Sequence, residues 1–171
     1  MKVDTYQLEN LQPEKRRNLL QTAADSGIKY LNSLESRRVN PSESELIDLE
    51  KLDIPLQEEA IEPESVIKLL NEVGLKTTMA NAGGRYFGFV IGGSHPVSVA
   101  ANWLASAWDQ NGGLEVTSPI NAKIEEITSE WLKELLPVSK DSVVGFVTGV
   151  TVANFCGLAA ARQRSDRKSV V

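Results

Sequence analysis

Apolar residues recur at intervals of three and four along several stretches of the chain, a spacing that places them on one face of an α-helix. The first of these stretches begins at Pro13, and its apolar positions are Leu20, Ala24, Ile28, Leu31 and Leu34. Ser42 and Glu45 have the spacing of a capping box, which predicts the start of a short helix. A longer helix is expected from Pro63, with Gly74 as its end.

The same helical pattern returns in the second half of the chain. One helix is expected from Pro96 to the breaker cluster 109–113. Another begins at Pro119, with Ser118 as its N-cap. Its apolar face consists of Ile120, Ile124, Ile127, Trp131 and Leu135. Residues 81–96 are rich in glycine and aromatic side chains, which suits an irregular loop whose rings pack against a neighbour or line a pocket.

Residues 142–154 have a different pattern. Residues 142–148 are a β-branched and aromatic run, which predicts a buried strand. Gly149-Val150-Thr151 follows as the turn, and a last helix is expected from Val152 to about Arg164, in which Cys156 is predicted to be a buried, inert thiol. A strand that turns tightly into a helix leaves backbone N–H groups at the positive end of the helix dipole, which suits a phosphate group. The same strand, glycine turn and helix also occur in α/β proteins that bind no ligand.

Composition narrows the classes of function. The chain has 171 residues, ordinary apolar and charged fractions and a net charge of −5, and it has no basic stripe with interleaved aromatics, so nucleic acid is not expected as a partner. A single cysteine excludes a disulfide framework within the chain and a cysteine-based metal cluster, and no metal site is predicted. No apolar run has the length of a signal-peptide core or a membrane span, so we expect a cytoplasmic protein without membrane contact.

An ordered series of motifs runs through the second half of the chain. Its members are Tyr86-Phe87-Gly88-Phe89, Gly92-Gly93, Pro96, Asp109-Gln110-Asn111, Ser118-Pro119, Glu125, Trp131-Leu132, Gly149-Val150-Thr151-Val152-Ala153-Asn154 and Ala160-Ala161-Arg162. From about residue 46 to residue 164, the chain resembles the N-terminal part of the pyridoxal-phosphate-dependent decarboxylases of the aromatic-amino-acid and glutamate decarboxylase group. The resemblance implies the α/β, aspartate-aminotransferase-like fold of the fold type I enzymes, a homodimer, and a protein of which this chain covers roughly the first third.

The resemblance also implies a division of the chain. Residues 1–76 would be an N-terminal helical arm used in dimerisation, and residues 77–165 the start of the cofactor-binding large domain. We expect this part of the fold to be mostly α with one clear strand at about 142–148. The hexapeptide 166–171 does not fit the pattern. Our hypothesis is that it is the translation of a common sequencing adaptor, so we expect it to be a non-native tail.

The site residues follow from the resemblance, position by position. Gly149, Val150 and Thr151 would cradle the phosphate of pyridoxal 5'-phosphate, with Thr151 offering a backbone N–H and a hydroxyl. The loop that contains Phe89, Val90 and Ile91 matches the substrate-pocket loop, and residues 111–114 match a segment near the partner's pocket. The family's Schiff-base lysine, its aspartate and its ring-stacking histidine lie downstream of the matched region. His95 does not match that histidine and is expected at a helix start.

The implied function is that of an amino-acid decarboxylase, a carboxy-lyase that uses pyridoxal phosphate as its electron sink. This chain lacks the Schiff-base lysine, so by itself it is expected to be inactive. Two alternatives remain open. One is a non-catalytic helical interaction domain, and the other is a different fold type I enzyme, such as an aminotransferase or an aldolase-like lyase.

Overall fold

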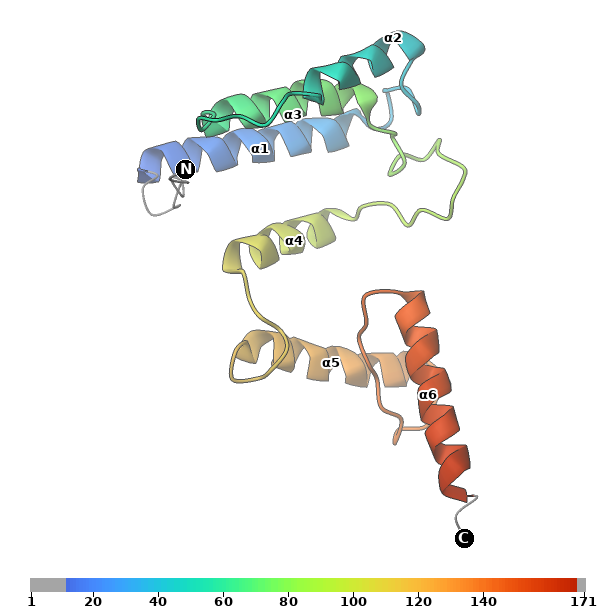
Figure 1. Ribbon diagram of the computed structural model, residues 1–171. Helices are drawn as coiled ribbons and strands as arrows, with labels where there is room; N and C mark the ends of the chain where they lie inside the picture. Colours follow the sequence, from blue (N-terminus) through green and yellow to red (C-terminus); the bar gives the residue numbers. More distant parts are fainter. Residues whose placement is uncertain (1–11, 169–171) are drawn as a thin grey trace. The chain divides into compact units, whose positions relative to one another are not determined.

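The computed structural model describes residues 12–168, which form helices joined by loops and turns (Figure 1). The elements are α1 (Pro13–Ser33), α2 (Glu43–Leu46), η2 (Ile47–Leu52, a 3₁₀ helix), α3 (Pro63–Thr77), α4 (Pro96–Trp108), α5 (Pro119–Leu135) and α6 (Val150–Lys168). The chain divides into two units, Met1–Val99 and Ala100–Val171, which are described separately below. The division into an arm (1–76) and the start of a large domain (77–165) stays a prediction.

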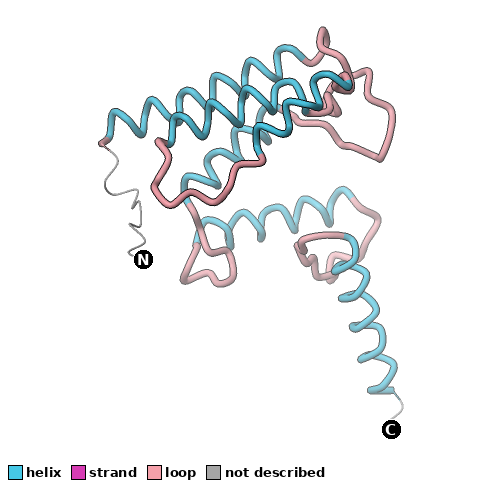
Figure 2. Tube along the Cα trace, turned by 45° about the horizontal axis from the view of Figure 1, so that its top comes forward, coloured by secondary structure: helices cyan, strands magenta, loops and turns pink. Residues whose placement is uncertain are grey.

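In the first unit, α3 is the central element. It packs against α1 on one side and against α2 and η2 on the other (Figures 1 and 2). Both α1 and α3 begin with proline in the first turn, where its missing N–H removes no helical hydrogen bond. The capping box is confirmed, because Ser42 and Glu45 exchange side-chain and backbone hydrogen bonds at the start of α2.

The predicted end of α3 at Gly74 is wrong, because the helix continues to Thr77. Gly74 does not adopt a positive φ, so it continues the helix instead of closing it. The helix ends where Thr78 turns to an extended conformation (φ −80°, ψ 142°) and its N–H bonds the carbonyl of Gly74. Val73, one turn before this end, is only 1% exposed.

The second unit contains α5, α6 and most of α4, which begins in the first unit. These three helices begin close to the predicted positions, but no two of them pack against each other within the described residues. Ser118 is the N-cap residue of α5 as predicted, although its side chain makes no capping hydrogen bond. Residues 166–168, expected in a non-native tail, continue α6, and the rest of that hexapeptide lies outside the described residues.

The predicted strand at 142–148 is wrong. Residues 142–147 are irregular, and residues 12–168 contain no strand (Figure 2). A strand needs a neighbour with which its N–H and C=O groups can form a ladder, and no described segment provides one. The prediction for Cys156 is also wrong, because its thiol is exposed on α6.

Many large apolar side chains of the described residues are exposed. Only Val73 and Ala80 are buried apolar residues in the described part of the chain, and Ser118 is its buried polar residue. Large apolar side chains such as Trp131 (61% exposed) and Phe155 (71% exposed) face solvent. These helices therefore lack the surface that would cover their apolar faces.

Candidate functional site

The start of α6 contains the three residues that the resemblance assigns to the cofactor phosphate. The N–H of Ala153 donates to the carbonyl oxygen of Gly149 over 3.1 Å, so Gly149 is the N-cap residue and Val150 is the first residue of the helix. The N–H groups of Val150, Thr151 and Val152 precede that first helical bond and have no partner within the helix. They lie at the positive end of the helix dipole. The geometry therefore suits an anion.

The space in front of this turn is open. A Cβ atom added to Gly149 would meet no heavy atom within 4 Å, and Gly149 has no positive φ. Val150 is 76% exposed, and Thr151 is also exposed. A phosphate group can therefore reach the backbone N–H groups and the Thr151 hydroxyl without displacing any described side chain.

We call residues 87–95, which contain Phe89, Val90 and Ile91, the aromatic loop. This loop lies in the first unit and has an unusual backbone. Phe89 and Val90 adopt positive φ values of 50° and 52°, and Gly93 follows at 78°. For a β-branched residue such as Val90 this conformation is strained, at a cost on the order of 1–2 kcal/mol. Phe89 and Val90 are almost fully exposed, and Ile91 is 47% exposed. The predicted substrate-pocket residues are thus exposed to solvent, Phe89 and Val90 more fully than Ile91.

The segment that leads into this loop is held by a group that the sequence analysis did not find. We call it the Arg37 clasp, and it comprises Tyr30, Arg37, Leu75, Met79 and Arg85. The guanidinium carbon of Arg37 lies 4.3 Å from the centroid of the Tyr30 ring, and an Arg37 N–H donates to the carbonyl of Leu75. The Tyr30 hydroxyl donates to the carbonyl of Met79 over 3.0 Å, and Arg85 donates to the carbonyl of Arg37.

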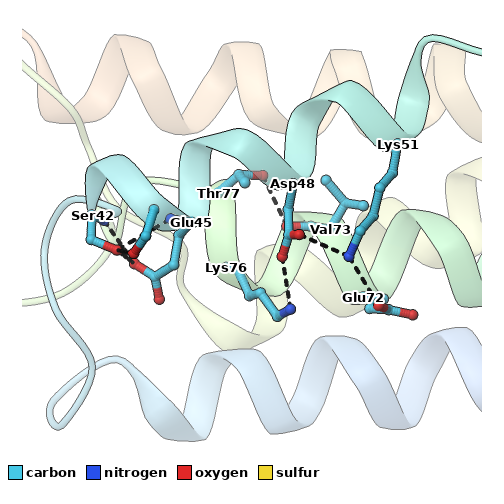
Figure 3. A network of polar contacts seen from close by, with 9 residues as sticks. Ser42, Glu45, Asp48, Lys51, Glu72, Val73, Lys76 and Thr77 are labelled. Carbon is cyan, nitrogen blue, oxygen red and sulfur yellow. Dashed lines mark hydrogen bonds and ion pairs between the residues drawn. The ribbon is translucent and has the colours of Figure 1, made fainter.

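A second polar network joins η2 to α3 (Figure 3). The Asp48 carboxylate accepts from the ammonium groups of Lys51 and Lys76, each at 2.7 Å, and Lys51 also lies 3.6 Å from Glu72. The hydrogen bonds from Lys51 and Lys76 lower the pKa of Asp48 to about 2. The bond to Asp48 raises the pKa of Lys51 in turn. All four side chains are solvated, so the network stabilises the packing of η2 on α3 only modestly.

The loop before α5 is compact. Asn111 accepts from the N–H of Gly113 over 3.1 Å through its side chain, and its carbonyl accepts from the Thr117 hydroxyl over 2.9 Å. Ser118 closes this loop, and its buried hydroxyl has no hydrogen-bond partner among the described residues. Gly112 packs so closely on Asn121 that an added Cβ would lie 2.8 Å from the Asn121 amide nitrogen.

Several smaller expectations can be placed as well. His95 is found at a helix start, because its carbonyl accepts from the N–H of Val99 at the beginning of α4. Within residues 12–168, no group of three or more histidine, cysteine, aspartate or glutamate side chains is arranged to hold a metal ion. None of the described helices is both long enough and apolar enough to cross a membrane.

The fold and the sequence of this chain are each similar to part of a known protein. The fold matches part of the crystal structure of mouse CSAD with a TM-score of 0.74 and 20% sequence identity, over 92% of this chain and 34% of that chain. In sequence, the chain is 30% identical over 164 residues to the aromatic-L-amino-acid decarboxylase of Bacillus atrophaeus, which covers 91% of this chain and 33% of that enzyme. No protein-family model matches the chain. The resemblance to the decarboxylases is thus confirmed over most of the chain, which spans about a third of the length of either relative.

The predicted site residues fall into two groups. Gly149, Val150 and Thr151 are adjacent at the start of α6, and Phe89, Val90 and Ile91 are adjacent in the aromatic loop of the other unit. Sequence reasoning missed the Arg37 clasp and the Asp48 network. Both depend on contacts between residues 21 to 49 positions apart, and neither has a periodic signal along the chain.

Proposed function

We propose that this chain is part of a pyridoxal-phosphate-dependent amino-acid decarboxylase and supplies the phosphate site for its cofactor. The observation that carries the proposal is the start of α6, where Gly149, Val150 and Thr151 offer unpaired N–H groups and a hydroxyl to an anion. They stand at the positions that the resemblance assigns to the phosphate. The 30% identity to a decarboxylase over nearly the whole chain supports the assignment.

The residues present fit the phosphate of this cofactor. Its dianionic charge matches the dipole of a 19-residue helix, and the absent side chain of Gly149 leaves open space beside the N–H groups. The Thr151 hydroxyl can donate one further charge-assisted hydrogen bond. Val150 takes part through its backbone, so its side chain does not enter into the contact.

When bound, pyridoxal phosphate accepts the electron pair of the bond that breaks as CO₂ leaves. The residues of this chain would bind and orient. Gly149, Val150 and Thr151 would fix one end of the cofactor, and the loop of Phe89, Val90 and Ile91 would contact the substrate side chain. The Schiff-base lysine, in this proposal, belongs to the two thirds of the relatives that the chain does not span.

We further propose that residues 1–76 serve as the dimerising arm of a homodimer, and residues 77–165 as the start of an α/β large domain of the fold type I class. The proposed location is the cytoplasm. The apolar face of α1 supports the arm, since Leu20 and Ile28 remain 63% and 47% exposed. A groove of about 650 Å³ between α1 and α3, lined by small and apolar side chains such as Ala23, Gly27 and Leu70, offers a surface for a second helix.

The proposal is tested by measuring CO₂ release by the protein expressed from its complete gene. The purified protein is incubated with a panel of L-amino acids, with and without pyridoxal phosphate. We expect CO₂ release from at least one amino acid that stops when the cofactor is removed. Formation of a keto acid without CO₂ would favour an aminotransferase, and the absence of any turnover with cofactor bound would contradict the proposal.

A further inference from the structure

The Arg37 clasp connects three parts of the first unit that are far apart in the sequence. Through its side chain, Arg37 stacks on Tyr30 of α1 and donates to the carbonyl of Leu75 near the end of α3. Through its own carbonyl, it accepts a hydrogen bond from Arg85. One residue therefore holds the end of α1, the end of α3 and the entry to the aromatic loop.

The backbone between α3 and the loop is fixed over the same region. The N–H of Ala80 donates to the carbonyl of Val39 over 2.8 Å, and Ala80 is only 2% exposed. The chain then turns through a hydrogen bond from Gly83 to the Ala80 carbonyl (3.1 Å). A Cβ atom on Gly83 would lie 3.3 Å from the carbonyl oxygens of both Ala80 and Leu34, so glycine permits this close approach.

The hydrogen bonds that fix the backbone end shortly after this turn. The N–H of Tyr86 still bonds the carbonyl of Gly83 over 3.2 Å. The side chains of Phe87, Phe89 and Val90, however, are almost fully exposed, and the last two of these residues have positive φ. The direction in which the loop projects is therefore set at its anchored end, by the clasp, and at its other end by the start of α4 at His95.

We propose that Arg37 is a positioning residue for the substrate pocket: stacked on Tyr30, it fixes the path of residues 78–86 and thereby the placement of Phe89, Val90 and Ile91. This inference rests on the proposed function, in which that loop contacts the substrate side chain. Arginine suits this position because its planar guanidinium can stack on a ring and donate in its own plane at the same time, which a lysine ammonium cannot do.

The test compares Arg37→Ala with Arg38→Ala in the protein expressed from its complete gene, with pyridoxal phosphate present. Arg38 is the matched control, because it has the same charge and is adjacent, but its side chain is exposed and outside the clasp. Hydrogen exchange is followed at the amides of Ala80, Gly83 and Tyr86. We expect Arg37→Ala to speed their exchange about tenfold, the usual effect of losing a hydrogen bond from a charged donor, and Arg38→Ala to leave it unchanged.

Steady-state kinetics separate a positioning role from a purely structural one, because only a positioning role predicts a change in KM with little change in kcat. Arg37→Ala is expected to raise KM for the amino acid about tenfold while kcat changes less than about twofold, because a misplaced loop weakens substrate binding. General destabilisation would reduce the active fraction and lower the apparent kcat instead. Equal KM values for the two arginine variants would overturn the positioning assignment.

A milder variant covers the case in which Arg37→Ala unfolds the first unit. Tyr30→Phe keeps the ring beneath Arg37 and removes only the bond to the Met79 carbonyl. We expect faster exchange confined to residues 79–86, and unchanged exchange at that segment would overturn the clasp. The exchange measurements do not depend on turnover. A protein that releases no CO₂ would therefore refute the proposed function, and the exchange rates would still test whether the Arg37 clasp holds residues 79–86.

Discussion

Each unit of the chain contains an amphipathic helix of similar length, α3 with 15 residues and α5 with 17 residues, yet only the first unit forms a packed structure. In the first unit, α3 contacts α1, α2 and η2, Val73 and Ala80 are buried, and hydrogen bonds such as that from Tyr30 to Met79 join distant segments. In the second unit, no described helix packs on another, and Ser118 is its buried residue. An amphipathic pattern therefore specifies a helix and an apolar face, but the face is buried only if another segment covers it.

The difference has an energetic consequence. A helix in a protein gains most of its stability from packing its apolar face, and little from intrinsic propensity. On α5 and α6, Trp131, Phe155 and Leu158 are more than half exposed. We therefore expect the second unit to need the surface that, in the proposed decarboxylase, the large domain provides. The first unit already has part of its core.

Matched Val→Asp substitutions should give the largest contrast between the units. Val73→Asp places a carboxylate at a position that is 1% exposed, and an uncompensated buried charge costs about 3–5 kcal/mol. Val143→Asp changes a position that is 95% exposed and should alter stability by less than about 0.5 kcal/mol. Urea unfolding of the 171-residue chain, followed by helical circular dichroism, measures both. Equal losses would contradict the difference in packing described here.

The two N-cap serines should show a smaller contrast. Ser42→Ala removes a confirmed capping box and should cost about 1 kcal/mol. Ser118→Ala removes a buried hydroxyl that has no partner among the described residues, so it should be neutral or stabilising by up to about 1 kcal/mol. The measurement is the shift in urea midpoint for each variant. A loss for Ser118→Ala as large as that for Ser42→Ala would show that the hydroxyl gains a partner in the folded protein.

The Asp48 network should give the smallest effect and is confined to the first unit. The folded-state pKa of Asp48, about 2, lies below the ordinary value of 3.8, so the network stabilises the fold above about pH 4. That stability is lost as the pH falls from about 4 towards 2, because the unfolded chain then binds the proton more readily. Asp48→Asn should remove this part of the acid-unfolding curve, and Asp53→Asn, an exposed control, should not. Acid titrations at low and high salt would check the result, and identical curves for both variants would refute it.

The sequence predicted the helices well because their signals are local. Proline at the first turn marks α1, α3, α4 and α5, and the spacing of Ser42 and Glu45 marks α2. The prediction of a strand at 142–148 is wrong because it rests on residue type alone. A strand forms only beside a partner that contributes hydrogen bonds. The prediction that Cys156 is buried is wrong for a similar reason. Small residues on a helix face permit close packing, but they do not supply the second surface that would cover the thiol.

The candidate site also has features that local sequence predicts and features that it does not. The start of the last helix follows from local sequence, and α6 begins at Val150, two residues before the predicted Val152. The strained backbone at Phe89 and Val90 and the clasp at Arg37 depend on contacts across the fold, so they could not be found by pattern alone.

Cofactor affinity of a Thr151→Ala variant tests the central claim most directly. The protein from the complete gene is titrated with pyridoxal phosphate and bound cofactor is followed by absorbance, with Thr128→Ala as a matched control whose hydroxyl bonds the Ile124 carbonyl on α5. If the start of α6 holds the phosphate, Thr151→Ala should weaken binding about 10- to 100-fold, through loss of a hydrogen bond to a charged group, and Thr128→Ala should bind like the unchanged protein. Equal affinities for the two variants would contradict the placement of the phosphate at Gly149, Val150 and Thr151.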